Sequence, residues 1–157
     1  MGAACKAKLR VDRRVGMRIS ARNQLKGVIA EVAEGAVNGV VTISLGDNQV
    51  KADITMESIK ELGLVKGKDA YAIIKATNVM FALGTERLAG LSARNQLAGT
   101  VCKVVKGAVN GHVSVQLPDG NVVSGSITNA AIEDLELAEG KPALAVIKAT
   151  DVIVGVD

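Results

Sequence analysis

The apolar residues of this chain recur at every second position over short stretches, which is typical of β-strands. Val41, Ile43 and Leu45 alternate with the polar residues Thr42 and Ser44. Because successive side chains of a strand point to opposite faces, this alternation predicts a strand with one buried face. In the first half of the chain the same reasoning predicts five strands, at residues 25–32, 39–45, 50–54, 70–75 and 79–83.

One segment between the predicted strands has the features of a short helix. Thr55 suits the N-cap position, and Glu57 suits the positive end of the helix dipole in the first turn. Leu62 faces the core, and Gly63 is a typical residue for the position after the last turn. Residues 128–135 repeat this arrangement, so we expect two short helices.

A repeat covers most of the chain. The hexapeptide Ser-Ala-Arg-Asn-Gln-Leu stands at residues 20–25 and again, letter for letter, at 92–97. Two further motifs, Gly-Ala-Val-Asn-Gly and Lys-Ala-Thr, also occur once in each half. About half of the aligned positions are identical, so one module of about 70 residues is present twice. The repeat divides the chain into a basic tail (1–16), a first module (17–84), a link (85–90) and a second module (91–157).

The order of the predicted elements indicates the fold class. Five short strands with a helix between the third and the fourth are expected of an OB-like barrel. Turn-forming residues at 46–48 and 118–120 suit the hairpins that such a barrel needs. We therefore expect an all-β chain with one short helix per module, built as two tandem OB-like five-stranded barrels. Modules this small bury a modest fraction of their surface, so we expect them to pair within and between chains.

Composition and charge narrow the classes of ligand. The formal net charge is +3, but the tail (1–16) alone carries about +4 and the rest of the chain about −1, so the two modules together are close to neutral. Aromatic residues make up 1% of the chain, with Tyr71 and Phe81 alone. An OB-fold nucleic-acid binder is one alternative that the fold and the basic charge allow. Such binders stack bases on aromatic side chains, which this chain lacks, so we expect no nucleic-acid partner.

The sequence lacks the usual signatures of an enzyme or a membrane protein. It contains no phosphate-binding loop, no nucleophile elbow and no metal-ligand spacing. The single histidine, His112, falls on the outward face of a strand, and Val40 occupies its position in the first module. No apolar stretch is long enough to span a membrane, and no secretory signal is recognisable. We expect a cytoplasmic protein that is not an enzyme and binds no membrane.

Three polar clusters occur in both modules and suit an oxyanion. Residues 20–23 offer a hydroxyl, a guanidinium and an amide, and residues 75–77 add an ammonium, backbone N–H groups and a second hydroxyl. Thr55 and Ser58 stand where unpaired N–H groups of a helix favour negative charge. A compact tetrahedral dianion needs donors of this kind from several directions. The clusters therefore predict a small-oxyanion site.

A purely structural interpretation accounts for the same residues one by one. A solvated arginine in a turn, a charge at a strand end and a helix cap need no ligand. Nearby surface positions, however, have diverged between the two copies. Lys26 corresponds to Ala98, and Glu31 to Lys103, while the Ser-Ala-Arg-Asn and Lys-Ala-Thr segments and the helix-start threonine are unchanged. This contrast is what a retained site would produce, and both interpretations stay open at this point.

The motifs resemble those of the molybdate-binding Mop module. The resemblance rests on Met-Arg-Ile-Ser-Ala-Arg-Asn-Gln from Met17, Glu-Gly-Ala-Val-Asn from Glu34, and Ile-Lys-Ala-Thr from Ile74. Two such modules in tandem are similar to the molbindins, which are small cytoplasmic molybdenum-binding proteins. The resemblance implies one OB-like barrel per module, six modules in a ring, and therefore a homotrimer. It also implies that each oxyanion lies between modules and is bound by residues of two of them.

Residue by residue, the resemblance assigns two groups of positions. The molybdate-binding group comprises Ser20, Arg22, Asn23, Thr55, Ser58, Lys75, Ala76 and Thr77 in the first module, and Ser92, Arg94, Asn95, Thr128, Lys148, Ala149 and Thr150 in the second. An axial anion site would involve Gly35, Ala36, Val37, Asn38, Gly107, Ala108, Val109 and Asn110. The chain departs from the pattern at Thr77 and Thr150, where many members have proline, and at Ala131, which replaces the serine.

The function that the resemblance implies is storage of molybdenum as molybdate, with tungstate as a close mimic. The metal would be bound only as its oxyanion, with no separate metal site and no cofactor. The alternative is a molybdate-sensing module that acts in trans on a transcription regulator or a transporter. In either case we expect the link residue Arg87 to be exposed and without a role in binding.

Overall fold

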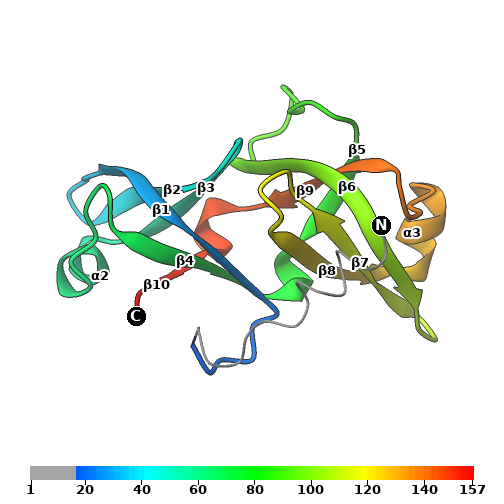
Figure 1. Ribbon diagram of the computed structural model, residues 1–157, viewed down its shortest axis with the longest axis horizontal. Helices are drawn as coiled ribbons and strands as arrows, with labels where there is room; N and C mark the ends of the chain where they lie inside the picture. The colour runs from blue at the N-terminus through cyan, green and yellow to red at the C-terminus, as the bar shows by residue number, and fades with distance from the viewer. Residues whose placement is uncertain (1–16) are drawn as a thin grey trace.

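The computed structural model describes residues 17–157, and it consists of two five-stranded curled sheets with two short helices (Figure 1). The basic tail lies outside the described residues. In chain order, the elements of the first repeat are β1 (Asn23–Ala33), β2 (Asn38–Leu45), β3 (Asn48–Thr55), α2 (Met56–Glu61), β4 (Asp69–Ile74), the 3-10 turn η1 (Ala76–Asn78) and β5 (Met80–Leu83). Those of the second repeat are β6 (Asn95–Lys106), β7 (Asn110–Gln116), β8 (Val122–Thr128), α3 (Asn129–Asp134), β9 (Pro142–Ile147), the 3-10 turn η2 (Ala149–Asp151) and β10 (Ile153–Gly155).

The predicted all-β class and the OB-like element order are confirmed. Each helix lies between the third and fourth strands of its repeat, and the predicted hairpins join β2 to β3 and β7 to β8. The long strand β1 pairs with β4 through its first half and with β2 through its second half. The register shifts between Ile29 and Glu31, where the strand changes partners. Such a bulge bends the strand and so helps to curl the sheet.

The repeat in the sequence and the sheet in the structure do not have the same boundaries. The order of one sheet is β10-β4-β1-β2-β3, and that of the other is β5-β9-β6-β7-β8. Strand β5 of the first repeat therefore completes the second sheet, where Phe81 pairs with Ala145. Strand β10 of the second repeat completes the first sheet, where Val154 pairs with Ala72. Each sheet thus contains four strands of one repeat and the last strand of the other.

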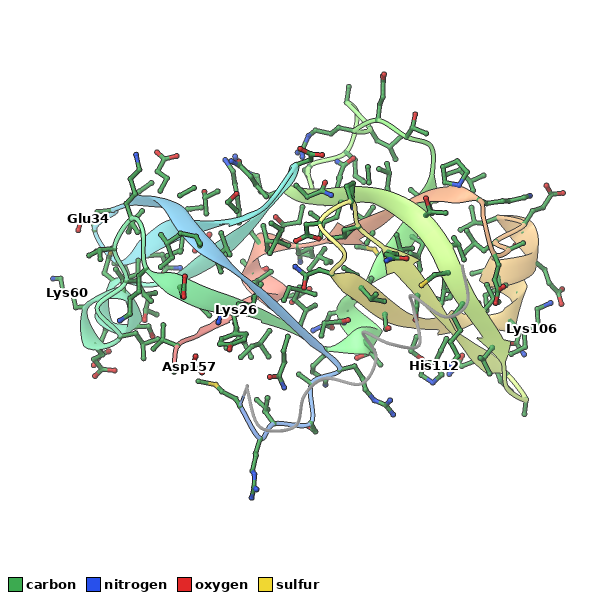
Figure 2. The ribbon with its side chains drawn as sticks, viewed as in Figure 1. Lys26, Glu34, Lys60, Lys106, His112 and Asp157 are labelled. Carbon is green, nitrogen blue, oxygen red and sulfur yellow. The ribbon has the colours of Figure 1, made fainter. Side chains whose placement is uncertain are left out.

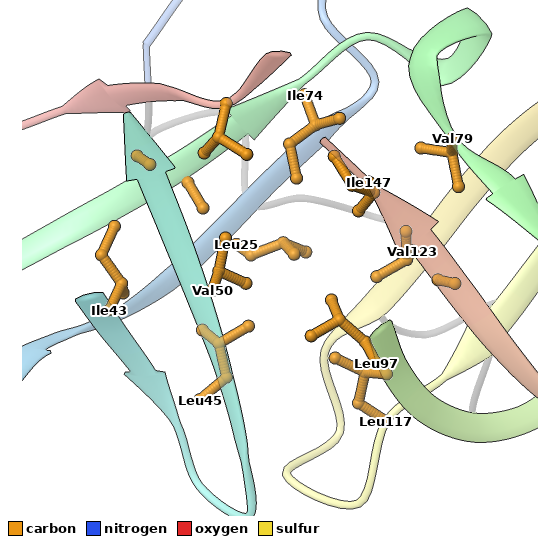
Figure 3. Close-up of a cluster of buried hydrophobic side chains, with 14 of the residues drawn as sticks. Leu25, Ile43, Leu45, Val50, Ile74, Val79, Leu97, Leu117, Val123 and Ile147 are labelled. Carbon is orange, nitrogen blue, oxygen red and sulfur yellow. The ribbon is translucent and has the colours of Figure 1, made fainter. Parts of the chain in front are cut away.

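A single hydrophobic core runs through both sheets (Figure 3). Leu25, Val50 and Ile74 of the first sheet and Leu97 and Ile147 of the second belong to one continuous cluster. Each of them is at most 2% exposed. Because burial of apolar area is the main favourable term in folding, a shared core makes the two sheets one cooperative unit.

The two helices begin in the same way and end differently. Thr55 and Thr128 are the N-caps, and each hydroxyl oxygen accepts the backbone N–H three residues later at 3.1 Å, as predicted. Gly63 follows the first helix with a φ of 60°, in the left-handed region that glycine tolerates. Glu136 takes the same place after the second helix with a φ of 51°, at a cost that a glycine would not have.

This difference leads to a prediction about stability. Glu136→Gly should raise the free energy of unfolding by about 1 kcal/mol, because it removes the steric conflict between the side chain and a left-handed backbone. The ion pair lost with the glutamate, to Lys141 at 3.7 Å, is exposed and contributes little. Urea denaturation measures the change, and Gly63→Ala should lower the stability in the same assay. Equal or lower stability of Glu136→Gly would contradict this account.

Candidate functional site

Two asparagine side chains join the two halves of the molecule. Asn23 Nδ2 donates to the backbone oxygen of Ser124 on β8 at 2.8 Å, and Ser124 N donates back to Asn23 Oδ1 at 2.7 Å. Asn95 forms the same pair of bonds with Lys51 on β3, at 2.8 and 2.7 Å. Each asparagine thus pairs with a strand of the other repeat as a neighbouring backbone would. Both are buried, at 2% and 0% exposure.

The asparagines were predicted to bind the oxyanion, and the structure gives their amides other partners. Both Nδ2 hydrogens of Asn23 are used, because the group also donates to the oxygen of Ile74 at 3.1 Å. Asn23 would have to give up one of these bonds to donate to an anion. The Ser-Ala-Arg-Asn motif therefore has two parts. Its asparagine is buried and joins the repeats, and the residues before it include exposed side chains.

Those neighbours are free to bind a ligand. Ser20, Arg22 and Lys75 are exposed, and within Met17–Asp157 no hydrogen bond or ion pair occupies their side chains. Asn23 pairs with Ile74 in the sheet, so Arg22 and Lys75 adjoin neighbouring ends of β1 and β4. The fold therefore brings the Ser-Ala-Arg-Asn segment and the Lys-Ala-Thr segment of one repeat to the same edge. The corresponding residues of the second repeat, Ser92, Arg94 and Lys148, are also exposed.

The two Lys-Ala-Thr segments form 3-10 turns. In η1, the N–H groups of Asn78 and Val79 donate to the oxygens of Lys75 and Ala76, at 3.0 and 3.3 Å. The turn itself leaves the N–H groups of Ala76 and Thr77 without partners, as the first residues of any helical turn are left. Turn η1 lies against β8, and η2 lies against β3. An exposed ammonium and two N–H groups without a hydrogen-bond partner among residues 17–157 are thus placed where the repeats meet.

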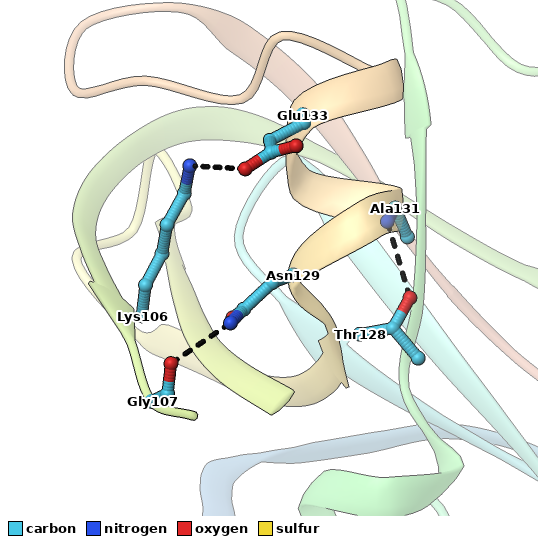
Figure 4. A network of polar contacts seen from close by, with 6 residues as sticks. All are labelled: Lys106, Gly107, Thr128, Asn129, Ala131 and Glu133. Atoms are coloured by element: carbon cyan, nitrogen blue, oxygen red, sulfur yellow. Dashed lines mark hydrogen bonds and ion pairs between the residues drawn. The ribbon is translucent and has the colours of Figure 1, made fainter. Parts of the chain in front are cut away.

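The helix-start hydroxyls lie elsewhere, beside the predicted axial loops. Thr55 pairs with Asn38 in the sheet, and the N–H of Met56 donates to Val37 O at 2.8 Å. Figure 4 shows the second copy, where Asn129 Nδ2 donates to Gly107 O at 2.8 Å. Asn129 N also donates to Val109 O at 2.8 Å. Helix start and axial loop therefore form one end of each repeat.

The structure thus divides the predicted residues into two groups. The Ser-Ala-Arg-Asn and Lys-Ala-Thr segments lie at the repeat junction, and the helix starts lie with the axial loops at one end of each repeat. Asn95 contacts β3 at Lys51, and Thr55 stands four residues further along that strand. At a rise of about 3.3 Å per residue, the separation along the strand is about 13 Å. In the same way, Asn23 contacts β8 at Ser124, and Thr128 stands four residues further along that strand. The two asparagines are therefore too far from the helix-start hydroxyls for one small tetrahedral anion to touch both at these positions.

A cavity opens where the first repeat meets the binding segment of the second. We call it the junction pocket. It has a volume of about 250 Å³ and is lined by Asp47, Asn48, Gln49, Lys51, Arg87, Arg94 and Gln96. Only Arg94 among these was predicted as a ligand. Lys51 and Arg87 could not be found from the repeat, because Lys51 corresponds to Ser124 and Arg87 belongs to the link.

Two further candidate features of the sequence, a metal-ligand cluster and the single histidine, can be compared with the structure. Among residues 17–157, no three histidine, cysteine or acidic side chains are grouped so that they could hold a metal ion. His112 is exposed at the outer end of the second repeat, as predicted, away from the repeat junction (Figure 2). No helix in the described part of the chain is long and apolar enough to cross a membrane.

Known proteins resemble both repeats. The TOBE domain family matches residues 19–81 and 91–154. The molybdenum transport protein ModE of Herbaspirillum seropedicae is 41% identical over 145 residues, which cover 92% of this chain and 54% of that protein. The molybdenum-pterin-binding protein MopA of Rhodobacter capsulatus is 38% identical over 138 residues, which cover 87% of this chain and 52% of that protein. The chain therefore spans about half the length of these curated relatives.

A solved structure matches the whole arrangement of two sheets. It is a crystal structure of the cytoplasmic molybdate-binding protein ModG with molybdate bound. The TM-score is 0.83 and the sequence identity 42%, over 90% of this chain and 100% of the ModG chain. At this identity and coverage, the similarity extends to the tandem OB-like architecture as a whole.

The asparagine pairs can be tested without any ligand. Asn95→Ala should lower the free energy of unfolding by about 2–4 kcal/mol, because it leaves the N–H and C=O of Lys51 without partners in a partly buried place. Chemical denaturation in molybdate-free buffer measures the loss. Asn78→Ala is the control, since its side chain forms no hydrogen bond among the described residues. Unchanged stability of Asn95→Ala, with weaker molybdate binding, would instead assign Asn95 to the ligand.

Proposed function

Because this chain belongs to the TOBE domain family, with one domain in each repeat, we propose that it binds molybdate and serves to store or buffer it in the cytoplasm. The observation that carries the proposal is the match to molybdate-bound ModG over 90% of this chain. ModE and MopA, the curated relatives described above, are named for molybdenum transport and molybdenum-pterin binding. Tungstate, a tetrahedral dianion of similar size, is proposed as an alternative ligand.

The exposed polar groups at the repeat junction support this proposal. Arg22 and Lys75 supply positive charge, Ser20 and Thr77 supply hydroxyl donors, and the start of η1 supplies backbone N–H groups. A dianion binds well to such converging charged and neutral donors. Apart from Arg22 and Lys75, the donors named here are neutral, which limits the positive charge of the site. A storage protein needs this balance, because it has to release its ligand as well as hold it.

The separation of the two predicted groups supports a site shared between modules. Asn23, at the start of β1, contacts β8 at Ser124, whereas the helix-start hydroxyl of Thr128 stands four residues further along β8, about 13 Å away along the strand. We propose that a module of another chain brings these groups together in a homotrimer. Val37 and Val109, which are 76% and 71% exposed in the axial loops, are apolar surface that such an assembly would cover.

A sensing role is the second candidate. It rests on the resemblance to ModE, which is called a transport protein and is about twice as long as the matched region. In that role, the bound anion would change the surface offered to a regulator or transporter, and the chain would act in trans. A pull-down that recovers such a partner only in the presence of molybdate would favour sensing over storage.

The binding proposal is tested by calorimetric titration of the full chain. We expect molybdate to bind, and sulfate and phosphate to bind more weakly. Arg22→Ala should weaken the molybdate affinity of its sites about tenfold or more, because a hydrogen bond to a charged group contributes about 1.5–3 kcal/mol. Equal or undetectable binding of all three anions would contradict the proposal.

Lys60→Ala is the control for this titration. It also removes one positive charge, but Lys60 lies on α2 at the outer end of the first repeat, far from the junction (Figure 2). If Lys60→Ala and Arg22→Ala weakened molybdate binding equally, the effect would come from net charge, and the assignment of Arg22 to the site would be wrong.

The natural difference between the two helix starts gives a separate prediction. Ala131 in the second repeat stands where Ser58 in the first carries a hydroxyl, 2.9 Å from Thr55 Oγ1. Ala131→Ser should tighten molybdate binding at the sites that use the second helix by about threefold, since one neutral hydrogen bond contributes about 0.5–1.5 kcal/mol. The same titration measures it, with Ser58→Ala as the reverse change. No effect from either variant would remove the helix starts from the site.

A further inference from the structure

The link between the repeats is fastened to the binding segment of the second repeat. Arg87 Nη1 donates to Arg94 O at 2.9 Å, and Arg87 Nη2 donates to Ala93 O at 3.1 Å. Next to it, Leu88 N donates to Gln96 Oε1 at 2.7 Å, and Gln96 Nε2 donates to Leu88 O at 3.3 Å. The planar guanidinium therefore holds two consecutive carbonyls of the Ser-Ala-Arg-Asn segment, a geometry that suits arginine and not lysine.

The opposite wall of the junction pocket comes from the first repeat. It is formed by the hairpin between β2 and β3, with Asp47 and Asn48, and by Lys51 on β3. Asn48 fixes this hairpin on the second repeat, because its Nδ2 donates to Ala98 O at 3.1 Å. Asn95 fixes β3 through the backbone of Lys51. Both walls are thus held in place by hydrogen bonds across the junction.

The charges that line the pocket match a dianion. Lys51, Arg87 and Arg94 bring three positive charges, and Asp47 brings one negative charge. The excess of two positive charges equals the charge of one tetrahedral dianion. The neutral amides of Asn48, Gln49 and Gln96 complete the lining and can donate hydrogen bonds. A carboxylate in the wall lowers the affinity for an anion and so favours release.

We propose that the junction pocket binds a small tetrahedral dianion, and that Arg87 is a positioning residue of this site. Arg87 acts by holding the backbone of Ala93 and Arg94, which sets the direction of the Arg94 side chain towards the pocket. The inference rests on the proposed molybdate-binding function and adds to it a contribution from the link. It also makes the two junctions unequal, because Ser124 stands where Lys51 would be on the other side.

The test is calorimetric titration of the full chain with sodium molybdate. Wild-type protein should show two classes of site. Arg87→Ala should weaken one class about tenfold and leave the class that depends on Arg22 unchanged. Arg87→Lys should remain weaker than wild type, because an ammonium keeps the charge but cannot donate to both carbonyls in the geometry of the guanidinium. Lys60→Ala is again the charge-matched control.

Each outcome bears on one of the two proposals. No binding to wild-type protein would overturn the proposed function. Binding by Arg87→Ala that equals that of Lys60→Ala would overturn the role of Arg87 alone. Full recovery in Arg87→Lys would reduce that role to charge and overturn the positioning assignment.

A second variant tests the pocket without removing any hydrogen bond from the link. Asp47→Asn takes away the only carboxylate in the lining and should tighten molybdate binding about threefold. It keeps the test open if the Arg87 variants unfold, which thermal denaturation without molybdate would show. Unchanged or weaker binding by Asp47→Asn would show that the anion does not occupy the junction pocket.

Discussion

The whole molecule depends on two buried amides that imitate backbone. Asn23 and Asn95 each offer one donor and one acceptor to a strand of the other repeat, and each pair of bonds is 2.7–2.8 Å long. A buried amide that lost these partners would carry a large desolvation cost, so the two repeats can meet in only one register. The exposed residues beside each asparagine are placed by that register. Arg22 and Arg94 stand at the junction because the next residue in the chain is locked there.

The exchange of the last strands reinforces this arrangement. Strands β5 and β10 each lie in the sheet of the other repeat, and the core runs without interruption between the sheets. A ligand site at the junction therefore stands on a frame that neither repeat could form alone. For a small anion bound mainly by direction-dependent donors, such a rigid frame matters more than the number of charges.

Much of the fold could be predicted from local pattern, because alternation, caps and turns depend on neighbouring residues. The strands, the N-caps Thr55 and Thr128, and the turn glycine Gly63 all follow from such signals. Strand exchange could not be predicted, since β5 has the same local sequence whichever sheet it joins. The buried role of Asn23 could not be predicted either, because an asparagine beside an arginine is equally consistent with a residue that binds an anion and with a residue that joins two strands. Arg87 was missed for a different reason, because no copy of it exists within the repeated sequence and its partners are backbone oxygens.

The exchanged strands also set the order in which the chain can fold. Ile153 pairs with Ile73, which lies 80 residues earlier, so the edge of β4 stays open until the second repeat has been made. Contacts between residues so far apart in sequence slow folding, and an open strand edge invites pairing with another chain. During synthesis, the first repeat therefore keeps an unpaired strand edge until β10 of the second repeat is available. At high concentration, the same open edge would accept β10 from a neighbouring copy, which links the folding of this protein to its association.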